Sequence, residues 1–301
     1  MHKLGRYLLE DRLGAGSFAT VWKAYDPELD TDVAVKVLAD NWASNADVRE
    51  RFLAEARLLR QISSPRVVRV HDVGVHDDRP YFVMDYIRGG TLADRIGHCG
   101  PAEALRLAAE AGYAAQVLHD AGVIHRDIKP SNLLLDAAST PAAVLVADLG
   151  SAKQLADASG LTVATGTPAY MAPEQAFQTG GLDARADVYA LGVVTFELLT
   201  GHKPFGPGGR AIMTMPEATT STLPTVPREL GIPNRIDTLL RATLSMDPGD
   251  RPPTARTFAD ALSQDTEAWG PDGPTRLRPL VVWLAAAVTF LATALLTWAV
   301  R

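Results

Sequence analysis

A short polar segment between apolar runs is the feature that most restricts what this chain can fold into. The segment His125-Arg126-Asp127-Ile128-Lys129-Pro130-Ser131-Asn132 is followed directly by Leu133-Leu134-Leu135. A second apolar run ends at Asp148-Leu149-Gly150, 21 residues after Asp127. This grouping of polar side chains between apolar runs is the strongest signal in the sequence.

Composition excludes several classes of protein. Of the 301 residues, 47% are hydrophobic and 21% are charged, which is typical of a globular chain. The net charge of −6 argues against a nucleic-acid-binding protein, which would normally be basic. The single cysteine, Cys99, excludes an intrachain disulfide and fits a reducing cytosol. Charged residues soon after the start of the chain exclude a signal peptide.

Periodicity predicts a β-rich first part and a helical second part. In the first part we expect strands at 7–13, 20–25, 31–38, 67–75 and 80–87, and one main helix at 47–60. In the second part we expect helices at 101–121, 187–199, 235–245 and 254–262, a short strand at 144–147 and a long loop at 206–233. The expected class is α+β with two lobes.

A glycine turn lies between the first two expected strands, in Leu13-Gly14-Ala15-Gly16-Ser17-Phe18-Ala19-Thr20-Val21. Paired glycines let backbone N–H groups approach phosphate oxygens closely. On its own, a glycine hairpin without a ligand explains this pattern more simply. The strand that follows it excludes a Rossmann loop, which would open a helix.

Lys36 lies among valines in the third expected strand. A lysine in such a strand usually faces solvent, but this one could also reach phosphates held at the glycine turn. It would then need a carboxylate partner on the following helix. Glu55 is the first candidate for this partner and Glu50 is the second.

Taken together and in this order, the motifs resemble the protein kinase family in its bacterial Hanks-type (eukaryotic-like) serine/threonine branch. The resemblance covers residues 7–264. It implies a bilobal fold over 1–264, with a small β-rich N-lobe at about 1–86 and a larger helical C-lobe at about 87–264. It also implies transfer of the ATP γ-phosphate to Ser or Thr hydroxyls of protein substrates, with Mg²⁺ or Mn²⁺ as cofactor. Autophosphorylation is implied on the activation segment, residues 150–174.

The resemblance assigns roles in the site residue by residue. Asp127 would orient the attacking hydroxyl, with Lys129 and Lys36 as the other catalytic residues, and Asn132 and Asp148 would hold the metal. The residues implied for ATP binding are Leu13, Gly14, Ala15, Gly16, Ser17, Phe18, Val21, Ala34, Lys36, Asp85, Ile87 and Leu134.

Further residues have implied structural or regulatory roles. Glu55 would pair with Lys36, and Glu174 would pair with Arg251. Asp187 would brace the catalytic loop, residues 125–132. Thr167 would shape the substrate groove. Arg126 would meet a phosphate on the activation segment, for which Thr162 and Thr165 are the candidate autophosphorylation sites; as the alternative, both are unmodified loop residues.

Two positions depart from the family pattern, since Ala19 replaces a glycine and Leu149 replaces a phenylalanine. Neither is an expected ligand of metal or phosphate, so an active enzyme is favoured over a catalytically silent scaffold. A small-molecule phosphotransferase is the third alternative. Thr167 and the segment Ala172-Pro173-Glu174 favour protein substrates instead.

An uncharged run closes the chain, from Leu280 to Val300. As a helix it would span roughly 31 Å, close to the thickness of the hydrocarbon core. Trp283 and Trp298 lie near its ends, as expected at membrane interfaces. We therefore expect a single transmembrane helix at 280–300 behind a juxtamembrane linker at 265–279.

The flanking charges set the expected orientation. Arg276 and Arg278 precede the span and only Arg301 follows it, a small excess that favours a cytoplasmic kinase domain at the cell membrane. The stronger argument for this orientation is that the implied kinase domain needs ATP. With one residue after the span, we expect no sensor domain beyond it within this chain. The resemblance also allows a homodimer formed through the N-lobe.

Overall fold

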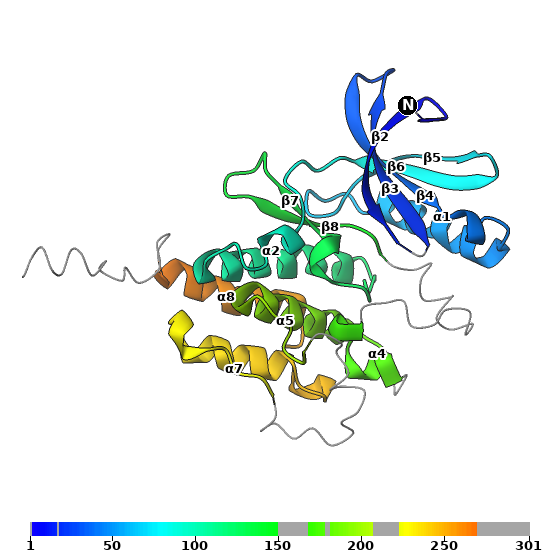
Figure 1. Cartoon of the computed structure of the whole chain (residues 1–301). Helices are drawn as coiled ribbons and strands as arrows, with labels where there is room; N and C mark the ends of the chain where they lie inside the picture. Colours follow the sequence, from blue (N-terminus) through cyan, green and yellow to red (C-terminus); the bar gives the residue numbers. More distant parts are fainter. Residues whose placement is uncertain (1, 17, 150–167, 178–180, 207–222, 270–301) are drawn as a thin grey trace, which may run out of the picture.

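The computed structural model describes residues 2–16, 18–149, 168–177, 181–206 and 223–269, which form two lobes (Figure 1). The N-lobe is an antiparallel six-stranded sheet of order β1-β2-β3-β4-β6-β5. Its strands are β1 (His2–Leu4), β2 (Tyr7–Ala15), β3 (Ala19–Asp26), β4 (Thr31–Leu38), β5 (Val70–His76) and β6 (Arg79–Asp85). The helix α1 (Ala46–Gln61) packs beside β5 and β6.

The sequence of α1 explains both its start and its orientation. The side chain of Asn45 accepts a hydrogen bond from Val48 N and caps the first turn. Apolar residues then recur at helical spacing and face the sheet, and the ring of Phe52 lies 5.0 Å from that of Phe82. Glu55 lies on the same buried face. The helix therefore carries one carboxylate into the interior of the N-lobe.

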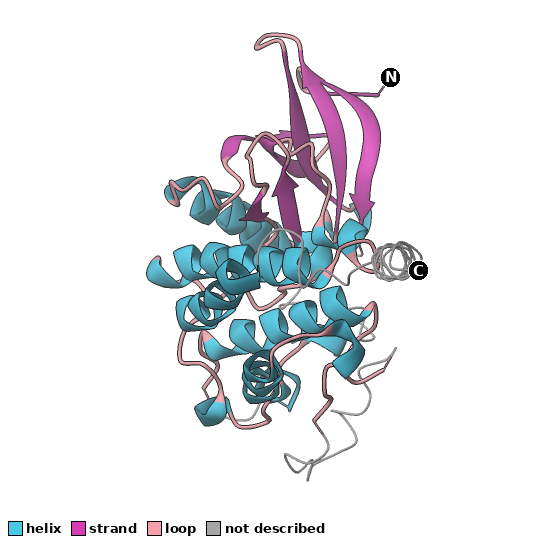
Figure 2. Ribbon diagram, turned by 90° about the vertical axis from the view of Figure 1, so that its left-hand side faces the viewer, coloured by secondary structure: helices cyan, strands magenta, loops and turns pink. Residues whose placement is uncertain are grey.

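The C-lobe is helical and lies below the sheet in the views of Figures 1 and 2. Its helices are α2 (Pro101–Asp120), α4 (Pro173–Phe177), α5 (Arg185–Thr200), α7 (Asn234–Thr243) and α8 (Ala255–Trp269). A two-stranded ribbon, β7 (Leu133–Asp136) with β8 (Ala143–Val146), lies between the lobes. Short 3-10 helices are η1 (Asp40–Trp42), η2 (Leu92–Arg95), η3 (Pro130–Asn132), η4 (Pro168–Tyr170), η6 (Arg228–Leu230) and η7 (Pro248–Asp250).

Several element boundaries differ from those expected. β5 begins at Val70 because the preceding residues bond to β8, where Val68 N donates to Val146 O. β6 ends at Asp85 rather than at residue 87, since the chain leaves the sheet there to join the lobes. The helix α8 continues to Trp269, past the expected start of the linker at residue 265, because no glycine or proline interrupts it before Gly270.

Some expectations concern parts of the chain outside the described residues. These include the candidate membrane span at 280–300, most of the linker before it, and 207–222 within the expected long loop. Among the helices that the structure does describe, none combines the length and apolarity needed to cross a bilayer.

Candidate active site

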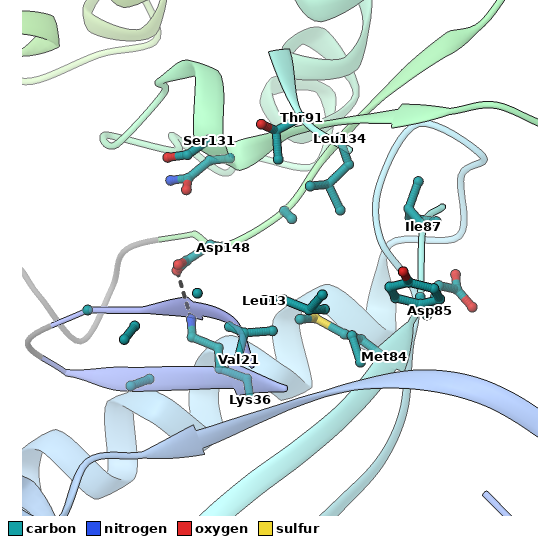
Figure 3. A pocket seen from close by; sticks show the side chains of 18 of the residues that line it. Leu13, Val21, Lys36, Met84, Asp85, Ile87, Thr91, Ser131, Leu134 and Asp148 are labelled. Atoms are coloured by element: carbon teal, nitrogen blue, oxygen red, sulfur yellow. Dashed lines mark hydrogen bonds and ion pairs between the residues drawn. The ribbon is translucent and has the colours of Figure 1, made fainter. Parts of the chain in front are cut away.

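A cavity of about 690 Å³ lies between the lobes and is lined by residues of both (Figure 3). It brings together most of the residues singled out from the sequence. These are Leu13, Gly14, Ala15, Gly16, Phe18, Val21, Ala34, Lys36, Glu55, Asp85, Ile87, Asp127, Lys129, Asn132, Leu134 and Asp148. Ser17, Thr162, Thr165 and Thr167 lie outside the described residues.

Lys36 is the cation at the centre of this pocket. Its Nζ lies 2.7 Å from Glu55 Oε1 and 2.7 Å from Asp148 Oδ1, and Figure 3 shows it pointing at Asp148. Glu55 is thus the partner carboxylate, whereas Glu50 pairs with Arg57 at the surface. Because β4 and α1 both belong to the N-lobe and Asp148 follows β8, this lysine joins the two lobes.

The ion pairs raise the pKa of Lys36 and lower the pKa of Asp148. Burial lowers the pKa of Lys36, but the carboxylates of Asp148 and Glu55 outweigh it and raise that pKa above its ordinary value. Burial raises the pKa of Asp148, but the Lys36 ammonium outweighs it and holds that pKa well below its usual range. The pocket therefore keeps both charges over the whole physiological pH range.

The catalytic loop groups three polar side chains opposite Lys36. Lys129 Nζ donates to Asp127 Oδ2 at 2.7 Å. Asn132 Nδ2 donates to the carbonyl of Asp127 at 2.9 Å and lies 3.3 Å from its Oδ2. These bonds hold the carboxylate of Asp127 in one orientation. Asn132 uses its amide nitrogen for them, so its amide oxygen takes no part in them.

His125 has a positioning role that the sequence did not reveal. Its ring is fully buried, and the backbone N–H of Asp127 donates to Nδ1 at 3.2 Å. The proton must then be on Nε2, which donates to the carbonyl of Ala147 at 3.1 Å. The ring thereby links Asp127 to the residue before Asp148. The histidine stood within the recognised motif, but nothing in the local pattern indicated this contact.

Two residues of the site adopt the left-handed conformation, with φ of +66° at Arg126 and +61° at Asp148. Such values cost free energy for residues other than glycine and persist only where the surroundings impose them. At Arg126 the carboxylate of Asp187, on the buried helix α5, imposes it. Asp187 accepts from the backbone N–H groups of His125 and Arg126, each at 2.8 Å. His119 Nε2 lies 2.8 Å from the same carboxylate.

The other end of the pocket is apolar. Val21 and Leu134 lie on opposite sides of it, with Met84 and Ile87 at the connection between the lobes (Figure 3). Thr91 also lines the pocket, a position not expected from the sequence. An end lined by apolar side chains in this way is the usual environment of a flat apolar ring.

A buried ion pair between Arg251 and Glu174 fixes α4, at the C-terminal end of the activation segment. Arg251 binds Glu174 in a bidentate manner, with Nη1–Oε1 at 2.7 Å and Nη2–Oε2 at 2.8 Å, and the Arg251 side chain is 0% exposed. On α4, Gln175 Nε2 donates to the carbonyl of Arg126 at 2.8 Å. This end of the segment is therefore bonded directly to the catalytic loop.

The chain matches the family model described as protein kinase domain over residues 7–263. PknB of Mycobacterium leprae, a serine/threonine-protein kinase, is 35% identical over 91% of this chain and 45% of its own length. PknJ of Mycobacterium bovis, also a serine/threonine-protein kinase, is 37% identical over 89% of this chain and 47% of its own length. The chain thus spans about half the length of these relatives.

The fold has counterparts among solved structures. The crystal structure of a double mutant of the Mycobacterium tuberculosis PknI kinase domain superposes with a TM-score of 0.68, at 25% identity, over 88% of this chain and 97% of that domain. A second crystal structure of the PknI kinase domain gives a TM-score of 0.64. The chain belongs to the protein kinase family and contains the kinase domain of its bacterial serine/threonine branch.

Proposed function

We propose that this chain transfers the γ-phosphate of ATP to serine and threonine hydroxyls of proteins. The observation that carries the proposal is the placement of Lys36, paired with both Glu55 and Asp148, opposite the catalytic loop in one pocket. Phosphoryl transfer needs positioning and positive charge more than covalent chemistry, and these residues offer both.

Each polar side chain has a definite task in this proposal. Lys36 Nζ binds the α- and β-phosphates. The carboxylate of Asp127 accepts the proton of the attacking hydroxyl as the O–P bond forms and the bond to the leaving ADP breaks. Lys129, already 2.7 Å from Asp127 Oδ2, offsets the charge on the transferred group.

The donor set of the pocket fits a magnesium or manganese ion. Asp148 offers a carboxylate and Asn132 an amide oxygen, and hard cations prefer oxygen ligands of this kind together with phosphates and water. The described residues hold no group of three His, Cys, Asp or Glu side chains that could bind a metal alone. Such an ion would neutralise phosphate charge, and the nucleotide itself would complete its coordination.

At the apolar end, backbone groups of Asp85 and Ile87 would bind the adenine edge. Val21, Ala34 and Leu134 would enclose the ring, consistent with their positions in the cavity. Arg126 is exposed beside Asp127, where it could meet a phosphate on the activation segment. We expect autophosphorylation at Thr162 and Thr165. Mass spectrometry of the active chain should detect it, and the absence of phosphate from both residues would contradict the expectation.

The decisive test is incubation of the full chain with Mg²⁺ and radiolabelled ATP, with and without a generic protein acceptor. Label on serine and threonine is expected in the wild type and should be lost in Lys36→Met and Asp127→Asn. A folded wild type that binds ATP but transfers no label would favour a silent scaffold. Transfer only to small molecules would favour the third alternative.

For the C-terminal run at 280–300, we propose a single membrane span that keeps the kinase domain at the cytoplasmic face. Its length and its terminal tryptophans support this. The full chain should resist extraction from membranes by alkaline carbonate, whereas a variant with several aspartates in the run should be released. Tethering also favours homodimers, so autophosphorylation per molecule should rise with surface density in vesicles.

A further inference from the structure

The tip of the glycine turn packs against a residue outside the pocket. The ring of Phe18 stacks on that of Trp42, with centroids 5.1 Å apart and an interplanar angle of 25°. Both side chains are only 8% exposed. Phe18 also lines the cavity, whereas Trp42 does not. The stack thus connects the pocket to η1, which contains Trp42 and contributes no residue to the pocket lining.

Backbone hydrogen bonds continue this connection to α1. Ala39 N donates to the carbonyl of Phe18 at 2.8 Å, and Trp42 N donates to the carbonyl of Ala39 at 3.0 Å. Asn45 N in turn donates to the carbonyl of Trp42 at 3.0 Å. Asn45 is the residue that caps α1, the helix that carries Glu55. The tip of the turn is therefore bonded, step by step, to the helix whose carboxylate holds Lys36.

The rest of the turn has little packing to hold it in place. From Glu10 to Ala15 the strand β2 is exposed, and a side chain added at Gly14 would meet no atom within 4 Å. At Gly16 such a side chain would meet only the carbonyl of Ala19, at 3.6 Å. The side chains of the turn thus contribute little packing. Besides the pairing of β2 with β3, two contacts hold the tip, namely the stack of Phe18 on Trp42 and the hydrogen bond from Ala39 N to Phe18 O.

We propose that Trp42 is a positioning residue for the ATP phosphates: it holds Phe18, and with it the glycine turn, over the phosphate end of the pocket. The inference rests on the proposed ATP-dependent activity. Trp42 acts through Phe18 and touches no phosphate itself. Its removal should weaken only those ligands that carry phosphates.

The test compares ATP, ADP and adenosine as ligands of the full chain by titration calorimetry, beside KM for ATP. In Trp42→Ala we expect the dissociation constants of ATP and ADP, and KM for ATP, to rise about fivefold to tenfold, the effect of losing one aromatic pair. Adenosine affinity should not change, because the side chains at the apolar end are untouched. Trp42→Phe can still stack and should stay within about twofold of the wild type.

The matched control is Trp22→Ala. Trp22 is in the same lobe, on β3, but packs against the cluster on the opposite face of the sheet. Its removal should change thermal stability without changing the ratio of ATP to adenosine affinity. If Trp42→Ala fails to fold, Trp42→Leu replaces it, since leucine keeps an apolar side chain at this site but cannot stack. Phe18→Ala combined with either variant should add little further loss.

Two results would overturn the proposal. One is an unchanged ATP affinity in Trp42→Ala with a lower melting temperature, which would make Trp42 a purely structural residue. The other is an equal loss of adenosine and ATP affinity, which would indicate collapse of the whole pocket. A wild-type chain that binds no ATP would contradict the proposed function, and this inference with it.

Discussion

Asp187 Oδ1 accepts a hydrogen bond from the backbone N–H of Arg126 at 2.8 Å, across 61 positions of the chain. Arg126 has a φ of +66°, and Asp127 is its neighbour. A carboxylate suits this place because it accepts hydrogen bonds at both oxygens and donates none. Asp187 thus determines the direction in which Asp127 enters the pocket, although Asp187 is not among the described residues that line it.

The variant Asp187→Asn should therefore lower kcat more than it raises KM. One side of an asparagine amide donates, so one of the two backbone N–H groups would lose its acceptor, a cost of about 1–3 kcal/mol. We expect kcat to fall about 100-fold, with KM for ATP within about threefold of the wild type, because Lys36 and the apolar end do not move. Steady-state kinetics at varied ATP measure both. An unchanged kcat would show that the loop keeps its shape without this carboxylate.

The variant Glu174→Gln should destabilise the C-lobe strongly. It leaves the guanidinium of Arg251, which is 0% exposed, without its charged partner. Breaking a buried pair in this way costs about 3–5 kcal/mol, which corresponds to a fall in Tm of about 10 °C for a domain of this size.

Glu50→Gln is the matched control for Glu174→Gln. It breaks the surface pair with Arg57, in which the Glu50 side chain is 66% exposed and the Arg57 side chain 61%. The Tm should stay within about 1 °C of the wild type. Thermal unfolding followed by circular dichroism compares the two variants. Equal melting temperatures in Glu174→Gln and Glu50→Gln would contradict the stabilising role of the buried pair.

Local periodicity predicted most of the fold because most elements here carry their own signal. The α1 helix is an example: apolar residues at helical spacing marked its buried face, and Glu55 fell on that face, so its pairing with Lys36 could be expected. The ribbon of β7 and β8 was only half expected. β7 follows η3 directly, so no turn residue separates the strand from the polar motif that precedes it.

Contacts between distant segments were the part that periodicity could not reach. The bond between Asp187 and the catalytic loop was expected only through the family resemblance, since nothing local to α5 indicates it. The hydrogen bonds of the His125 ring and the stacking of Phe18 on Trp42 were not expected at all. Each of these contacts joins segments that are far apart in the sequence, and the local pattern around a residue does not show which distant segment will pack against it.

The depressed pKa of Asp148 predicts a pH-dependent contribution to stability. A carboxyl with a folded-state pKa below its unfolded value of about 3.9 stabilises the fold above that value, and the contribution disappears as pH falls through the folded-state pKa. Asp148→Asn lacks this contribution. The difference in Tm between the wild type and Asp148→Asn should therefore change between pH 5 and pH 3, to the disadvantage of the wild type, and stay constant from about pH 6 to pH 8. A constant difference down to pH 3 would mean that Asp148 titrates normally.

The variant Gly89→Ala should disturb the apolar end of the pocket and leave the phosphate end intact. A Cβ at Gly89 would lie 2.0 Å from the carbonyl oxygen of Leu135, so the backbone on one side must move. The hydrogen bond from Leu135 N to Gly90 O, 2.9 Å long, crosses the same contact, and Leu134 beside it lines the pocket. We expect a fall in Tm of about 5 °C and adenosine affinity about tenfold weaker.

Gly181→Ala is the control for Gly89→Ala, because a Cβ at Gly181 would meet nothing within 4 Å. It should leave both Tm and adenosine affinity unchanged. The Gly89 variant should weaken adenosine and ATP by the same factor, since the lost contacts all lie at the end of the pocket where the ring binds. Trp42→Ala should weaken ATP but not adenosine. If Gly89→Ala binds adenosine as tightly as the wild type, β7 can shift without moving Leu134. The contact between Gly89 and Leu135 would then have no influence on the end of the pocket where the ring binds.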